Sequence, residues 1–229
     1  MKRVYLVLVF ALLGADPKPS GGTITGKVAA VSNGKVVQRD DVFVYLVEVG
    51  KRRRRGALPG AGKQFAIRQK REEFVPKVLV IPVGADVAFP NDDATDHNVF
   101  SPTDPTFDLG RYGTDKRGRV QRFEDVDEFD IYCNIHSKMR AKVKVVDTPY
   151  IQPVVGGKFT FTNIPPGRYR VVAWMKNSKE VFEEVEVVAG ATKQLSAELH
   201  PQVVRRSGCH DRKDGSPYPA RYNPCPPDD

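Results

Sequence analysis

The sequence lacks any long window in which apolar residues recur with the 3.6-residue period of an amphipathic helix. It also lacks apolar runs of the roughly 20 residues that a membrane-spanning helix needs. These absences exclude a helical fold, and we expect no stable insertion in a membrane. What the 229 residues do contain is Val-rich segments broken by 19 Gly and 18 Pro, which predicts an all-β protein. The length allows one large domain or two small ones.

Residues that commonly carry chemistry are also scarce, with four His, three Cys and three Met. A c-type haem attachment sequence is missing, because Cys209-His210 is not preceded by the first Cys of Cys-x-x-Cys-His. No nucleophile stands at a recognisable spacing from a base. We therefore do not expect an enzyme.

The chain has fewer acidic than basic residues and a net charge of +8, but the charge is unevenly distributed. Residues 77–147 hold 10 Lys and Arg against 13 Asp and Glu, a net −3, which leaves +11 for the remainder. The excess lies mainly in Lys51–Arg55, in Lys63–Arg71 and near the C-terminus. Basic runs can bind nucleic acid or anionic membranes, but no nucleic-acid motif accompanies them, so we expect a solvated surface and no nucleic-acid partner. Lys51–Arg55 can be either a docking patch for an acidic partner or a surface loop.

The N-terminal residues have the order of charge, apolar core and small residues that is typical of an export signal. Lys2 and Arg3 precede the ten apolar residues Val4–Leu13, and Gly14-Ala15 follows them. No Cys comes next, so a lipoprotein anchor is not expected. We interpret residues 1–20 as a signal peptide and expect a periplasmic or secreted protein. The alternative is an ordinary buried N-terminal strand.

The three cysteines divide into a pair and a single residue. Cys209 and Cys225 share a Pro-rich tail and can close a loop by a disulfide, whereas Cys133 stands apart. That division suits one structural disulfide and one metal thiolate. A buried free Cys133 is the alternative, but it leaves the residues around Cys133 unexplained.

Cys133, His136 and Met139 form the sequence Cys-x2-His-x2-Met on one short stretch, and His97 supplies a second imidazole upstream. Two His, one Cys and one Met are the ligand set of a blue-copper site, which must accept both Cu(I) and Cu(II). Strands expected at 128–133 and 141–146 would hold the short stretch rigid, and His97 would come from another strand. Taken singly, His97 is more typical of a surface or hydrogen-bonded residue and Met139 of a core residue.

Several neighbouring residues are candidates for supporting that site. Asn98 is predicted to bond the backbone of Cys133–Met139, here called the ligand loop, and so to orient the ligands. Phe89, Phe100, Phe107 and Tyr132 are predicted to keep water away from the metal. The acidic residues Asp92, Asp93 and Asp96 are interpreted as a solvated turn, with a site for a hard cation as the alternative.

Residues 78–146 resemble a small cupredoxin of the plastocyanin–amicyanin type. The matching stretches are VGADVAFPNDD, DHNVFS, FDLGRY, IYCNIHSKM and AKVKVV. The resemblance implies a Greek-key β-sandwich over residues 63–147 with one type 1 copper, bound by His97, Cys133, His136 and Met139. Val126-Asp127-Glu128 departs from the Pro-Gly turn that is common in the family, which affects the turn and not the ligands.

The flanking segments carry a second resemblance. GGTITGKVAAVSNGKVVQRDDVFVYL and GGKFTFTNIPPGRYRVVAWM look like the two halves of a small carboxypeptidase-regulatory-like, or transthyretin-like, Ig-type sandwich. We expect residues 21–62 and 148–200 to pair, with the cupredoxin inserted between them and residues 201–229 as an irregular tail. The alternative is two consecutive sandwiches. Alternating segments between 158 and 199 predict consecutive hairpins.

Together these features predict an exported one-electron carrier with an unidentified redox partner, and the whole resembles exported bacterial cupredoxins labelled methylamine-utilisation proteins. A copper-delivery or binding module without a redox partner is the alternative, although the chain has no Met-rich tract. A multicopper oxidase is excluded as a single chain, because its oxygen-reducing cluster needs more than the four histidines present. His136 would be the exit for the electron.

Overall fold

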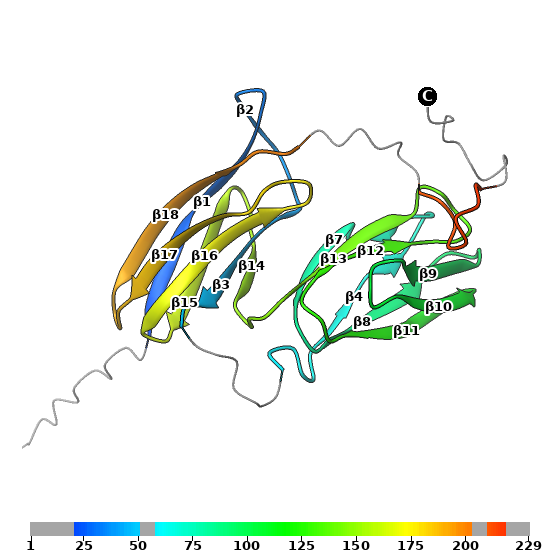
Figure 1. Ribbon diagram of the computed structural model, residues 1–229, viewed down its shortest axis with the longest axis horizontal. Coiled ribbons are helices and arrows are strands. Elements are labelled where there is room, and N and C mark those ends of the chain that lie inside the picture. Colours follow the sequence, from blue (N-terminus) through cyan, green and yellow to red (C-terminus); the bar gives the residue numbers. More distant parts are fainter. Residues whose placement is uncertain (1–20, 51–57, 203–209, 219–229) are drawn as a thin grey trace, which may run out of the picture.

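The computed structural model describes residues 21–50, 58–202 and 210–218, and these residues form strands joined by turns. Two β-sandwiches lie side by side along the long axis of the molecule (Figure 1). The prediction of an all-β fold is confirmed, and no helix is present in the described ranges. None of those residues forms an apolar helix of membrane-spanning length.

The first sandwich is built from both ends of the chain. Its strands are β1 (Gly22–Ser32), β2 (Lys35–Val37), β3 (Val42–Glu48), β14 (Ile151–Pro153), β15 (Lys158–Ile164), β16 (Gly167–Met175), β17 (Val181–Val187) and β18 (Thr192–Leu199). One sheet has the order β15-β1-β18 with β2 attached to β1, and the other has the order β14-β3-β16-β17. Apolar side chains from alternate positions of these strands, such as Ile24 and Leu46, fill the space between the two sheets.

The pairing of β1 is the feature that distinguishes insertion from two consecutive sandwiches. β1 runs antiparallel to β15 and parallel to β18, and it makes no ladder with the strands of residues 78–91. This pairing supports the insertion arrangement. At Gly26 a Cβ atom would lie 2.4 Å from the Leu195 carbonyl oxygen and 2.8 Å from the Phe159 ring, so only glycine permits the close packing there.

The prediction of consecutive hairpins is correct only for β16 and β17. The turn at Asn163–Gly167 carries the chain from β15 in one sheet to β16 in the other, and β18 returns to pair with β1. Turn residues mark where a strand ends, but they do not decide whether the next strand pairs with it or crosses the sandwich.

The second sandwich occupies the middle of the chain. Its strands are β4 (Gln64–Ala66), β5 (Arg68–Gln69), β6 (Phe74–Val75), β7 (Val78–Pro82), β8 (Ala85–Asn91), β9 (His97–Ser101), β10 (Phe107–Tyr112), β11 (Asp115–Phe123), β12 (Glu128–Tyr132) and β13 (Arg140–Val146). One sheet has the order β10-β9-β12-β13-β7, and the other has the order β11-β8-β5-β6 with β4 attached to β8. The core between them includes Cys133 and Met139, which are both fully buried. Two of the four predicted ligands thus belong to this core.

A third apolar cluster joins the two sandwiches. Trp174 and Val172 of β16 pack with Val80 of β7 and Val146 of β13. Beside this cluster the Trp174 indole N–H donates to Glu128 at 2.9 Å. The two sandwiches therefore share a packed interface.

Three predictions fall outside the described residues. These are the signal peptide at 1–20, the basic run Lys51–Arg55 and the disulfide between Cys209 and Cys225. Each of them stays a prediction. The only cysteine in the described part of the chain is Cys133, which is buried and free.

Candidate metal centre

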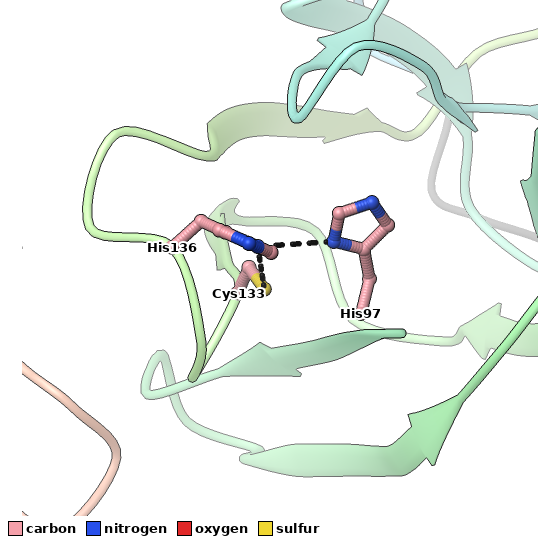
Figure 2. A group of neighbouring side chains, drawn as sticks. All are labelled: His97, Cys133 and His136. Atoms are coloured by element: carbon pink, nitrogen blue, oxygen red, sulfur yellow. Dashed lines mark hydrogen bonds between the residues drawn. The ribbon is translucent and has the colours of Figure 1, made fainter. Parts of the chain in front are cut away.

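Three of the four predicted ligands converge at one end of the second sandwich. His97 begins β9, while Cys133 and His136 lie on the loop between β12 and β13. The two His ring nitrogens and the Cys sulfur lie within 4.8 Å of one another, and no other group of three or more such residues occurs in the described ranges. Figure 2 shows the imidazoles directed at one another with the thiol beside His136.

The distances within this cluster suit a first-row metal ion. The two Nδ1 atoms of His97 and His136 are 3.1 Å apart, and the Cys133 Sγ lies 3.8 Å from the Nδ1 of His136. An ion bound at about 2.0 Å from nitrogen and about 2.3 Å from sulfur separates its ligand atoms by roughly 3–4 Å. The donor set therefore fits one metal. Thiolate and imidazole suit both copper and zinc, and two His with one Cys is the set found in blue-copper sites.

Met139, the fourth predicted ligand, is fully buried at the end of the same loop. Its backbone closes the loop, because the Cys133 N–H donates to the Met139 carbonyl at 3.2 Å and the Met139 N–H donates to the His136 carbonyl at 3.1 Å. The loop therefore has a fixed backbone frame. The coordination of a metal by the Met139 sulfur stays a prediction.

Asp93 fixes His97 from the side opposite the cluster. Its Oδ2 atom lies 2.8 Å from the His97 Nε2, which places the ring proton on Nε2 and leaves the Nδ1 lone pair facing His136 and Cys133. His97 itself is fully buried. Burial opposes the ionisation of Asp93, but the N–H groups of Glu72 and Arg71 and the His97 ring hold the pKa of this carboxyl below its usual range.

The turn that Asp93 holds has an unusual sequence. Arg71 and Glu72 connect β5 and β6 with φ angles of 57° and 56°, the left-handed values of a type I′ turn that normally contains Asn and Gly. Such values cost roughly 1–2 kcal/mol for each ordinary residue. The Asp93 carboxylate accepts the N–H groups of Arg71 at 2.6 Å and Glu72 at 2.9 Å, which offsets that cost.

This turn also brings a carboxylate to the second imidazole. The Glu72 Oε1 lies 3.7 Å from the His136 Nε2. Burial lowers the pKa of His136, and the charge of Glu72 opposes that shift. His136 keeps 13% of its side chain exposed, whereas the side chain of His97 has none.

The Cys133 sulfur is buried but not isolated from hydrogen-bond donors. Burial raises the pKa of this thiol, and the backbone N–H groups of Asn98, Ile135 and His136 oppose that effect. The Ile135 nitrogen lies 3.4 Å from the sulfur. Donors aimed at the sulfur stabilise a thiolate, which is the form that binds a metal.

Asn98 lies between the ligand loop and the neighbouring strand. Its side-chain oxygen accepts the N–H of Asn134 at 3.3 Å, and its amide donates to Asp108 at 2.7 Å. The side chain is therefore placed as a backbone anchor for the loop. Of the aromatic residues predicted to exclude water, Phe89 and Phe100 are buried, while Phe107 and Tyr132 are half-buried.

The acidic turn after β8 is not the plain solvated turn that the sequence suggests. Asp92 pairs with Arg68 at 2.6 Å, and Asp96 pairs with Arg111 at 2.8 Å. With Asp93 engaged by His97, each of the three carboxylates faces a cationic or donor side chain, which argues against a site for a hard cation. The pair of Asp93 and His97, four residues apart, was not predicted from the sequence.

Comparison with known proteins finds no matching family model and no match among curated proteins. Among solved structures, the chain is similar to a Cu(I) amicyanin variant with 20% identity and a TM-score of 0.34, covering 36% of this chain and 82% of that one. It is also similar to a reduced amicyanin variant, with 21% identity and a TM-score of 0.35, covering 38% of this chain and 85% of that one. A third similar structure is a Cu-containing nitrite reductase from Thermus scotoductus SA-01, with 24% identity and a TM-score of 0.34, covering 44% of this chain and 25% of that one.

Proposed function

We propose that this protein is an exported type 1 copper protein that carries single electrons and is not itself an enzyme. The observation that carries the proposal is the group of His97, Cys133 and His136, of which the first two are buried, with ligand atoms within 4.8 Å of one another. Copper bound there would supply reversible exchange between Cu(I) and Cu(II). Met139, buried on the same loop, is proposed as the fourth ligand.

The support around these residues favours electron transfer over copper delivery. Asp93 orients His97, Asn98 anchors the loop backbone, and backbone N–H groups face the Cys133 sulfur. A site held in this way changes little between oxidation states, as an electron carrier requires. A delivery site would need mobile, exposed ligands, and the three residues here are buried or nearly so.

Among the proposed ligands, His136 is the exit for the electron. It is the imidazole that retains solvent exposure, and the neighbouring Glu72 is 59% exposed. A redox partner docking over His136 would therefore approach within a short distance of the metal. We propose that this partner is a protein in the periplasm or outside the cell.

The test is to add Cu(II) to the purified metal-free protein and record its visible spectrum. We expect an intense thiolate-to-copper band that disappears in Cys133→Ser, because serine cannot supply the sulfur. His200→Ala is the matched control, since His200 is 67% exposed and belongs to the other sandwich, and it should leave the band unchanged. Colourless protein that binds one zinc tightly would contradict the electron-carrier function.

A further inference from the structure

Residues 210–218 lie against the ligand loop although they follow the last strand of the other sandwich. In Figure 1 this segment, in red, sits beside the loop that joins β12 and β13. Hydrogen bonds give it a structure of its own: the Arg212 N–H donates to the Ser216 carbonyl at 3.1 Å, and Asp214 accepts the Ser216 N–H at 3.0 Å. We call residues 210–218 the C-terminal strap.

The strap bonds both ends of the ligand loop. The hydroxyl of Tyr218 donates to the carbonyl oxygen of Cys133, and the Tyr218 side chain is 95% buried by this contact and its neighbours. At the other end, the His210 Nε2 lies 3.2 Å from the Met139 carbonyl oxygen and the Nδ1 lies 2.8 Å from the Asp211 carbonyl oxygen. The neutral ring has one N–H group, and the tautomer with the proton on Nε2 donates it to Met139. The Cys133 and Met139 carbonyls belong to the first and last predicted ligands of the loop.

The strap also completes a hydrogen-bonded ring of four residues next to Cys133. Asn98 bonds to Asn134, and the Asn134 side-chain oxygen accepts the N–H of Lys213 at 2.9 Å. The Lys213 ammonium then donates to Asp108 at 2.7 Å, and Asp108 accepts from Asn98 to close the ring. The ring links β9, β10, the ligand loop and the strap.

Aromatic packing seats the strap on the sheet. The His210 ring stacks on Tyr132 with centroids 4.1 Å apart and planes 12° apart, and it meets Tyr218 and Phe100 edge-on. Tyr132 immediately precedes Cys133. The strap is thus bonded and packed where β12 passes into the ligand loop.

We propose that the C-terminal strap is a positioning element of the metal site, which holds the backbone of the ligand loop at Cys133 and Met139. The expected effect of the strap on bound copper rests on the function proposed above, but its effect on the backbone of the loop does not. Without the strap, the two carbonyls and Asn134 lose partners outside the loop, so the loop opens more often and the ligand atoms occupy a wider range of positions.

The experiment measures amide hydrogen exchange of Cys133, Asn134 and Met139 in the metal-free full chain. Tyr218→Phe keeps the ring and removes the hydroxyl, and His210→Phe keeps the stacking and removes the ring nitrogen. Each variant should speed exchange of these amides about fivefold, which is the effect of one lost hydrogen bond. Tyr45→Phe is the control, because it removes the hydroxyl that bonds Glu180 at the interface between the sandwiches, and it should leave the loop amides unchanged.

A second readout distinguishes the strap from the copper proposal. In Cu(II)-loaded Tyr218→Phe we expect a shifted charge-transfer spectrum and reduction potential, whereas Tyr45→Phe should match the natural protein. Faster loop exchange in a protein that binds no copper would support the strap and contradict the proposed function. A blue protein whose loop exchange, spectrum and potential are unchanged in both strap variants would overturn the strap and leave the proposed function standing.

Discussion

The two sandwiches share an architecture but bury different side chains. The core of the first contains aliphatic and aromatic residues with a single sulfur, that of Met175. The core of the second ends in Cys133 and Met139, and six of the eight buried polar or charged residues in the described ranges also belong to this sandwich. These six are Gln69, Asn91, His97, Asn98, Ser101 and Ser137.

Buried polar groups are costly unless they find partners, at about 1–3 kcal/mol for each unsatisfied group. In the second sandwich nearly all of them do, and the Gln69 Oε1 is the one buried side-chain nitrogen or oxygen atom without a hydrogen-bond partner in the described part of the chain. The two sandwiches therefore differ in the role of their buried residues. The first supplies a plain apolar body, and the second uses buried polar bonds to hold chemically active groups.

The largest effect is expected when one core residue from each sandwich is replaced and the two variants are compared. Leu46 and Ile131 are both fully buried, and Ile131 lies on the buried face of β12, two residues before Cys133. Replacement of either by Ala should lower the free energy of unfolding by about 2–5 kcal/mol, measured by denaturant titration. Only Ile131→Ala should also broaden or weaken the copper band, because it leaves a cavity beside the ligand strand. An equal loss of the band in Leu46→Ala would show that the two bodies cannot be separated.

A smaller effect is expected where a polar bond positions a ligand. Asp93→Asn leaves one acceptor oxygen for the three groups that the carboxylate serves, namely the Arg71 and Glu72 N–H groups and His97. We expect copper affinity to fall about 10-fold or more, measured by competition with a chelator of known affinity.

The matched control for that substitution lies one residue earlier. Asp92→Asn removes a carboxylate from the same turn, but Asp92 contacts Arg68 and Lys116 and not a predicted ligand. Its effect on copper affinity should be within experimental error. If both variants weaken copper equally, the turn as a whole and not the bond to His97 positions the ligand.

Three of the four proposed ligands could be predicted from the sequence because they lie close together along the chain. Cys133, His136 and Met139 occupy one short loop, so spacing alone brings their side chains near one another. Asp93 was missed because a carboxylate in a polar turn has the same sequence pattern whether it faces water or an imidazole. The turn at Arg71 and Glu72 was missed because left-handed turns are normally recognised by Asn and Gly.

The strands show the same contrast between features set by nearby residues and features set by distant ones. The alternating burial of β12 and of most of β13 follows from their sequences, and both strands lie within one residue of the predicted bounds. The pairing of β1 with β18 joins residues about 170 positions apart and was predicted only through resemblance. The C-terminal strap carries no periodicity at all, since its position depends on individual hydrogen bonds and not on an apolar face.

The smallest expected effect tests whether the interface between the sandwiches is structural only. Glu128 accepts hydrogen bonds from Trp174 at 2.9 Å and Lys144 at 3.1 Å, and its side chain is 37% exposed. Burial opposes its ionisation, but Lys144, Lys142 and Trp174 hold the pKa of Glu128 below its usual range. Because solvent screens the pair, Glu128→Gln should cost only about 1 kcal/mol at pH 7.

That cost should depend on pH in a defined direction. A carboxyl with a depressed pKa in the folded state contributes fully above its unfolded pKa of about 4.3 and loses the contribution as pH falls through the folded value. The stability difference between the natural protein and Glu128→Gln should therefore shrink on acidification below about pH 4.3, measured by urea titration. Glu124→Gln, at a 65% exposed side chain of the same sandwich, is the control and should change stability by less than about 0.5 kcal/mol. Neither substitution should alter the copper spectrum, and a shift in Glu128→Gln would mean that the interface transmits strain along β12 to Cys133.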